Sequence, residues 1–574
     1  MDDCKLYPVV VRYFDQSLGR IVCSLLTMVE WKEASTGENI FKLLDQELTL
    51  KRRIPWSNCV SFSSDNASVM SGMGKGVAGH ISRTQPSVYF MGCACHLMNI
   101  AAQKAASELP CSASDVLIDI YYYLDKSANR KQNLKQFQCL YGKDTKKILQ
   151  LVNTRWLSLG QCLNRLLEMW TPLKSYFRNE EKKIDGKTKG KHTNITIKPK
   201  DSSAKSKTTS SKNKDCCTKP NDTASSARPT VKPSDNTAKP QPQSQAFDLS
   251  SYLFKQKELQ TQKDNQTRQS TKVESKTYAQ RKVEKVSTFL SGRTNRLYCL
   301  FLQGAIPLFE QANLVLQKEE PCVHIMNRTL LKQLRDILVR YVKPDCLLGD
   351  LTTVDYANDL SHKADQALFI GKAAKDYISE TSDLSLSKFY NNVRNFYITA
   401  TRYMLKKFPF NDELLQHAEV ANPEMKLTKD FTSVAYFTSR FTFLVPPEDM
   451  DRLEGQFLNF QVEDCSEAPS ERVDLFWSYI SRQKNANGQL KFDLLARVMC
   501  AVLTIFHSNA DSERIFSVVT KNKNKFRPNL STPVLSSIIT HKMCLQSSGQ
   551  VCHSATISQD TLKKAKQATA AKLL

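Results

Sequence analysis

The sequence predicts an α/β layer architecture at the N-terminus, followed by a long helical region. Three observations lead to this prediction. Strand-like and helix-like patterns alternate over roughly the first 110 residues. Helical spacing then dominates from residue 115 to about 178 and again from about 285 to 462. Between these helical stretches lies a polar, lysine-rich segment without apolar periodicity.

The first expected elements form a hairpin. The run LYPVVVRYF (6–14) is short and β-branched, a polar turn DQSLGR follows, and IVCSLLTMV (21–29) supplies an antiparallel partner. The segment TGENIFKLLDQELTLK has helical spacing, with Thr36 as its N-cap. The runs CVSFSS (59–64) and SVYFMGCAC (87–95) are typical of short strands, and each is followed by a helix.

Composition divides the rest of the chain. Residues 181–250 hold 15 basic and seven acidic residues, with Phe247 as the only aromatic residue, which is typical of a flexible cationic insert. We therefore expect an N-terminal core part with following helices (1–178), a disordered basic insert (179–281), a helical domain (282–472), a C-terminal core block (473–545) and a basic tail (546–574).

The charge balance favours a polyanionic partner. The 574 residues include 81 Lys and Arg against 57 Asp and Glu, a formal net charge of +24, to which the insert contributes. Nucleic acid is the first candidate. The 17 cysteines are scattered and the N-terminus has no secretory pattern, so we expect reduced thiols. No run approaches 18 consecutive apolar residues, so we expect no membrane span.

Two motifs near the strand ends carry candidate functional residues. Asp65 stands where a strand ends and a helix begins, a position from which a carboxylate can reach a metal ion or simply cap the helix. Cys93, Cys95 and His96 are of the residue types that bind zinc. No second ligand pair stands out, so a strand end packed by small thiols is the competing interpretation.

Two further motifs lie at expected helix starts. Arg155 and Trp156 could meet a phosphate and stack on a base, although such aromatic residues more often anchor a core. In HSNADSERIFSVV, Ser508 and Asp511 resemble a capping box that places Glu513 in the first helical turn. The basic residues that follow suit either a phosphate-facing rim or a solvated helix face; they are Lys521, Lys523, Lys525 and Arg527.

The order of these motifs is more specific than each motif alone. SDNASVM, CACHLMNIA, TRWLSLG and, far downstream, SNADSERIFSVVTKNK with RPNLS resemble the hAT superfamily of transposases and their domesticated relatives. The resemblance runs from about residue 5 to 178 and from about 434 to 545. It implies a ribonuclease-H-like α/β core, interrupted by a large all-α insertion, with a C-terminal dimerisation region.

The resemblance also implies roles for particular residues. Active members use Asp, Asp and Glu to hold two divalent metal ions, which stabilise the attacking and leaving oxygens of strand cleavage. By motif, the second Asp is Asp65 and the Glu is Glu513. Cys93 and His96 match a structural Cys-x-x-His pattern.

The same resemblance assigns surfaces for DNA and for a second subunit. Arg155 and Trp156 match an Arg-Trp motif that supports distorted DNA. The apolar stripes of the two C-terminal helices are implied to mediate dimerisation; they comprise Ile515, Phe516, Val519, Val534, Leu535, Ile538 and Ile539.

One part of the pattern is missing. The first Asp of the triad belongs to a strand just upstream of LYPVVVRYF, and this sequence begins only a few residues before that run. We therefore expect a ribonuclease-H-like core that lacks its first strand and leaves neighbouring strand edges unpaired. The chain as written then needs no cofactor, and Mg²⁺ or Mn²⁺ enters only if an upstream strand completes the triad.

The leading hypothesis is a transposon-derived, catalytically inactive nuclear protein. It would act as a homodimer or larger oligomer, with DNA as a weak, electrostatically bound partner. The alternative is a metal-dependent DNA transposase whose first strand lies upstream of this sequence. A third interpretation is a nuclear scaffold that binds no nucleic acid and uses its helical middle as a partner platform. We expect neither a membrane partner nor a small-molecule substrate.

Overall fold

The computed structural model describes residues 5–151, 157–190, 277–524, 526–551, 553–554 and 556–573. The chain divides into two units, one formed by Met1–Arg178 with Arg281–Leu574, and the other by Asn179–Gln280. The predicted disordered insert falls largely on residues 191–276, which lie outside the described residues. At its start, helix α8 (Trp170–Gly190) continues past the expected boundary at residue 178.

The predicted N-terminal hairpin is confirmed. Strand β1 (Lys5–Asp15) pairs antiparallel with β2 (Arg20–Trp31), with a register shift between Val9 and Val10. β-branched residues favour these strands. Gly19 at φ 61° allows the tight connection between them, because a left-handed conformation costs glycine little.

A second, parallel pair of short strands follows. Strand β3 (Ser61–Ser64) pairs with β4 (Tyr89–Gly92), and among the described residues this sheet has no further strand. Strand β4 ends before the predicted strand does, since Cys93 is already the N-cap of the next helix. The helices of this region are α1 (Gly37–Asp45), α2 (Ser68–Ser71), α3 (Val77–Thr84) and α4 (Ala94–Ala106), with a π-helical turn η1 (Gln46–Lys51) after α1.

Helices account for most of the remaining described chain. After α4 come α5 (Ala113–Asp125), α6 (Ala128–Leu140), α7 (Leu157–Glu168) and α8. The expected helical domain contains α10 (Tyr278–Ser291), α11 (Arg293–Leu316), α12 (Val323–Leu338), α13 (Lys372–Glu380), α14 (Leu386–Lys407), α15 (Glu413–His417), α16 (Phe431–Arg440) and α17 (Met450–Val462), with short 3₁₀ turns between them.

Helix α11 is long and apolar enough to cross a membrane, by length and composition. It buries residues such as Leu297, Phe301 and Phe309 against its neighbours, and rings of α14 meet it, with Phe301 and Phe396 centred 5.1 Å apart. A core helix of a folded domain passes the same test, so this finding is weak evidence for a membrane partner.

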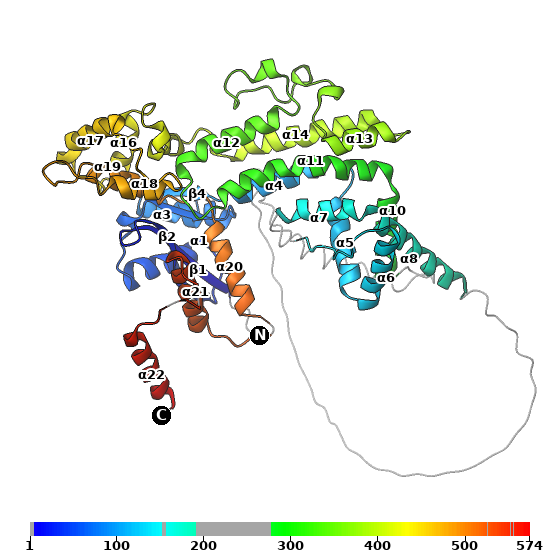
Figure 1. The fold of residues 1–574 in the computed structure, drawn as a ribbon, viewed down its shortest axis with the longest axis horizontal. Helices are drawn as coiled ribbons and strands as arrows, with labels where there is room; N and C mark the ends of the chain where they lie inside the picture. Colours follow the sequence, from blue (N-terminus) through cyan, green and yellow to red (C-terminus); the bar gives the residue numbers. More distant parts are fainter. Residues whose placement is uncertain are drawn as a thin grey trace, which may run out of the picture. The chain divides into compact units, whose positions relative to one another are not determined.

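The C-terminal block consists of α18 (Val473–Ile480), α19 (Asp493–Leu503), α20 (Ala510–Asn522), α21 (Thr532–Ser547) and α22 (Gln559–Leu573). Helices α20 and α21 lie against the β1–β2 hairpin, as Figure 1 shows. Their contact is a buried cluster made by Leu25 and Met28 of β2 with Ile515, Leu535 and Ile539. Burial of these side chains fixes the helix pair on one face of the hairpin.

Of the two predicted helix N-caps, the one at α1 is confirmed and the one at α20 is wrong. Thr36 caps α1 by accepting a hydrogen bond from the Asn39 amide, as expected. The predicted capping box at Ser508 is wrong, because Asn509 is the N-cap of α20 and no side chain accepts a capping bond there. The Ser508 hydroxyl instead accepts from the Ala510 amide at 3.4 Å. Glu513 nevertheless lies in the first turn of α20.

Candidate functional site

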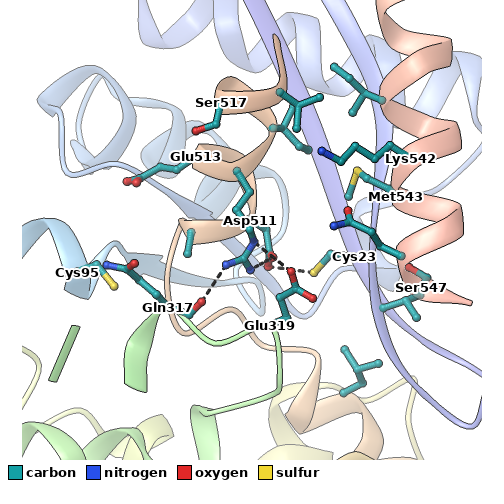
Figure 2. Close-up of a pocket in the computed structure, with 18 of the residues that line it drawn as sticks. Cys23, Cys95, Gln317, Glu319, Asp511, Glu513, Ser517, Lys542, Met543 and Ser547 are labelled. Carbon is teal, nitrogen blue, oxygen red and sulfur yellow. Dashed lines mark hydrogen bonds and ion pairs between the residues drawn. The ribbon is translucent and has the colours of Figure 1, made fainter. Parts of the chain in front are cut away.

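A cavity of about 620 Å³ brings together segments that are far apart in the sequence. Figure 2 shows it between the start of β2, the helix pair α20/α21 and the loop that carries Gln317 and Glu319. Cys95 of α4 and Ser158 of α7 also line it, together with Glu513 of α20. Cys95, Ser158 and Glu513 belong to three of the four sequence motifs, so residues from these three motifs meet at this cavity.

The first turn of α20 presents two carboxylates that point to different sides (Figure 2). Asp511 points toward the hairpin, where it accepts a hydrogen bond from the Cys23 thiol at 3.0 Å and pairs with Arg514. Burial raises the pKa of the Cys23 thiol, so it remains protonated as the donor. Arg12 Nη1 lies 3.8 Å from Asp511 Oδ2, and the Arg12 side chain is only 1% exposed. Asp511 is thus compensated by two guanidinium groups.

Glu513 lies within electrostatic reach of two thiols at the start of α4. The hydrogen bond from the Cys95 thiol lowers the pKa of Cys93, and donating that bond raises the pKa of Cys95. The Asn509 amide also approaches Cys93 Sγ at 3.5 Å. The start of α20 therefore contacts the start of α4 through the Cys93 thiol.

Asp65 is exposed in the turn after β3. Its Oδ1 accepts a hydrogen bond from the Ala67 amide at 3.2 Å, while Ala67 itself is the N-cap of α2. Asp65 therefore stabilises a turn and does not cap the helix. The next residue, Asn66, donates to the Cys93 carbonyl at 2.9 Å, which brings this turn to the same region of the fold as α20.

The resemblance implies a divalent metal ion at Asp65 and Glu513, so we compared their surroundings with the needs of Mg²⁺ and Mn²⁺. These ions prefer carboxylate and carbonyl oxygens. Glu513 instead has the thiols of Cys93 and Cys95 in its vicinity. In the part of the chain that the structure describes, no three His, Cys, Asp or Glu residues gather as a metal site. Thiols are poor ligands for Mg²⁺ and Mn²⁺, so the surroundings of Glu513 do not fit such an ion.

The predicted Cys-x-x-His pair points in two directions. Cys93 is buried, whereas His96 is exposed on α4, so the two side chains do not converge. His96 contacts the Cys93 thiol through its backbone amide. Cys93 is therefore a thiol packed at the end of a strand, which was the competing interpretation of this motif.

The predicted nucleic-acid-binding residues are placed in part. Arg155, Trp156 and Lys525 lie outside the described residues. Lys521 is exposed on α20 and lines the cavity, together with Lys542 of α21, which extends toward α20 in Figure 2. The remaining two predicted cations follow α20, with Lys523 half-buried as its C-cap and Arg527 exposed.

The predicted dimerisation residues separate into an inner and an outer set. Ile515, Leu535 and Ile539 are buried against the hairpin of the same chain, so they hold this chain together. Val519 packs partly against that cluster, and Ile538 is half-buried.

The outer set remains on the surface. Phe516 is 46% exposed, Val534 is 49% exposed, and Phe526, which the sequence analysis did not select, is 95% exposed. We call these three residues the outer apolar set. Of the predicted dimerisation residues, Phe516 and Val534 are therefore the two that are exposed to solvent.

Sequence reasoning missed the buried charges under α20. Arg12 interrupts the apolar run VVVRYF, and an isolated charge in such a run is itself a signal that a special environment is required. His507 is another buried group; burial lowers its pKa to about 3, and its Nε2 lies 3.2 Å from the Lys318 carbonyl. Lys542 carries no sequence signal, because only the packing of α21 brings it to the cavity.

The sequence matches no protein-family model.

Proposed function

We propose that this chain is a catalytically inactive relative of hAT-superfamily transposases. It binds nucleic acid through the lysines at the cavity rim and self-associates through the outer apolar set. We propose the nucleus as its compartment, since its polyanionic partner is there. The observation that carries this proposal is the convergence at one cavity of the start of α4, the start of α7 and the helix with Glu513 and Lys521.

The charges around the cavity support binding of phosphates. Among the acidic groups, Asp511 is already paired with Arg514 and lies close to Arg12. Lys521 and Lys542 are exposed, and the structure gives neither an ion pair within the described chain. When such lysines bind phosphates, they displace the cations condensed on the nucleic acid. Binding of this kind does not depend on base sequence, and its affinity falls steeply as the salt concentration increases.

The donor groups support a non-catalytic role. Two-metal strand cleavage needs carboxylates clustered around the ions. Here Asp65 accepts the Ala67 amide in an exposed turn, and Glu513 stands beside two thiols. Mg²⁺-dependent nicking of a DNA duplex by this chain, lost on Glu513→Gln, would contradict the inactive assignment.

The nucleic-acid part is tested by binding of a labelled 30-base-pair duplex across a salt series. The variant Lys521→Ala/Lys542→Ala removes two cations at the rim, so the slope of log K against log salt should become shallower by about 1.8. Lys372→Ala is a suitable single-charge control, because Lys372 is exposed on α13 and its ion pair among the described residues is with Asp376. Equal slopes for the wild type and the double variant would refute binding at the rim.

The association part is tested by light scattering at micromolar concentration. Phe516→Asp/Val534→Asp places charges within the outer apolar set, and we expect a dimer for the wild type and a monomer for this variant. Leu458→Asp is the matched control, because Leu458 is similarly exposed on α17 and should leave the dimer intact. A wild-type monomer would contradict the proposal.

A further inference from the structure

Two thiols lie side by side at the junction of β4 and α4. Cys93 is the N-cap of α4, and Cys95 follows in the first turn of that helix. The Cys95 thiol donates a hydrogen bond to the Cys93 sulfur, so the two sulfur atoms are in contact. The Cα atoms of residues two apart are at most about 7 Å from one another, which suits the range of about 4.4–6.8 Å found in disulfides. Both thiols are free in the structure.

The surroundings of Cys93 favour a negative charge on its sulfur. Besides the Cys95 thiol, the Asn509 amide approaches Cys93 Sγ at 3.5 Å, and the His96 amide contacts it. Cys93 also stands at the N-terminus of a 13-residue helix, whose dipole favours anions. The Glu513 carboxylate opposes this charge, yet the hydrogen bonds outweigh it and lower the pKa of Cys93. Such surroundings are typical of nucleophilic cysteines.

Cys95 connects the pair to the cavity. It is 5% exposed and lines the 620 Å³ cavity, whereas Cys93 is 1% exposed. The Ser508 hydroxyl donates to the Cys95 sulfur, which holds this side chain in place. Because so little of the Cys95 surface is accessible, a reagent little larger than water suits this access and a bulky one does not.

We propose that Cys93 and Cys95 form a reversible oxidation site for hydrogen peroxide. The Cys95 sulfur attacks one peroxide oxygen, the O–O bond breaks, and the other oxygen leaves as water with the Cys95 proton. The Cys93 sulfur then attacks the resulting sulfenic acid, the S–O bond breaks, and hydroxide leaves as water with the Cys93 proton. The two sulfurs together lose two electrons to the peroxide oxygens, so one peroxide and two thiols give one disulfide and two waters.

Cys23 provides a comparison within the same cavity. Its thiol lines the cavity too, but it donates to Asp511 at 3.0 Å. Burial and this carboxylate raise the pKa of Cys23 and keep it protonated, so it is a poor nucleophile. Access to the cavity is shared by Cys23 and Cys95, whereas a sulfur acceptor for the thiol proton distinguishes Cys95. The proposal therefore requires Cys95 to react and Cys23 to stay reduced.

The test is mass spectrometry of the full-length protein after treatment with hydrogen peroxide, unfolding and alkylation of the remaining thiols. Trypsin releases both cysteines of the pair in one peptide, residues 84–104. We expect this peptide to lose two hydrogens and to carry no alkyl group, and a dithiol reductant to restore both thiols. The loss should proceed several-fold faster than oxidation of Cys346, an exposed thiol on another surface, while Cys23 stays reduced.

Two substitutions locate the reaction. Cys93→Ser removes the sulfur that closes the disulfide, so peptide 84–104 should gain oxygen at Cys95 and no longer lose two hydrogens. Cys111→Ser removes another buried thiol and should leave the reaction of that peptide unchanged.

Three results would overturn the proposal. They are retention of both thiols in peptide 84–104 while Cys346 is oxidised, oxidation of Cys23 as fast as that of the pair, and a disulfide that joins Cys93 or Cys95 to a third cysteine. All three are read from the wild-type protein, so the decision holds even if a substituted chain fails to fold.

Discussion

Removal of the Asp511 carboxylate should destabilise the contact between α20 and the hairpin strongly. The Arg12 side chain is 1% exposed and that of Asp511 is 10% exposed, so Asp511→Ala leaves a buried guanidinium without a counter-charge. Breaking a buried pair in this way typically costs about 3–5 kcal/mol. Arg514 adds little to this cost, because its side chain is 38% exposed and can turn to water.

The assay is hydrogen exchange, since a chain of this size does not unfold in one cooperative step. A cost of about 3–5 kcal/mol corresponds to exchange of the β1 and α20 amides that is roughly 10²- to 4 × 10³-fold faster. The double variant Arg12→Met/Asp511→Leu replaces the charges by apolar groups and should restore most of the protection.

A surface pair provides the control. Asp336→Ala breaks the contact with Lys332 on α12, whose side chain is 74% exposed, and should cost less than about 1 kcal/mol. If Asp511→Ala accelerates exchange no more than Asp336→Ala does, the view of Arg12 as a buried charge held by Asp511 is wrong.

Three further outcomes follow from the same structure. Leu535→Ala should lower the free energy of opening of α21, measured by hydrogen exchange, by about 2–5 kcal/mol, because Leu535 is fully buried. Val534→Ala on the exposed side should change it little. Burial lowers the pKa of His507 to about 3, so the folded state binds a proton at this residue less readily than the unfolded chain does. The free energy of unfolding should therefore fall by up to about a few kcal/mol as pH decreases from about 6.5 toward 3. His507→Gln should flatten this part of a thermal-melt pH series, and an unchanged profile would exclude His507 as the cause. Thiol labelling should modify exposed Cys544 in the native protein and buried Cys299 only after denaturation, and rapid native labelling of Cys299 would contradict its burial.

Local features of this fold could be predicted from sequence, because short-range physics determines them. The hairpin follows from β-branched alternation around a polar turn, and the α1 cap follows from Thr36 with a helical pattern behind it. The cap of α20 was mispredicted because the packing of Asn509 against Cys93 displaces the start of the helix by one residue from the Ser508 pattern.

The site itself depends on contacts between distant segments, which periodicity does not report. Glu513 was selected by motif, yet its thiol neighbours come from α4, more than 400 residues earlier. Arg12 and Asp511 form their contact across a similar separation, and neither was predicted to meet the other. The apolar stripes of α20 and α21 were recognised, but their pattern could not tell which side faces the hairpin and which side faces solvent.

Hydrogen exchange of the protein with and without a DNA duplex tests the central claim most directly, because it reports where the nucleic acid binds. The cavity-rim account predicts that added DNA protects amides of α20 and α21 around Lys521 and Lys542, and that the protection fades as salt increases. Protection confined to the lysine-rich segment 191–276 and the C-terminal tail would contradict it, since binding would then require nothing of the cavity.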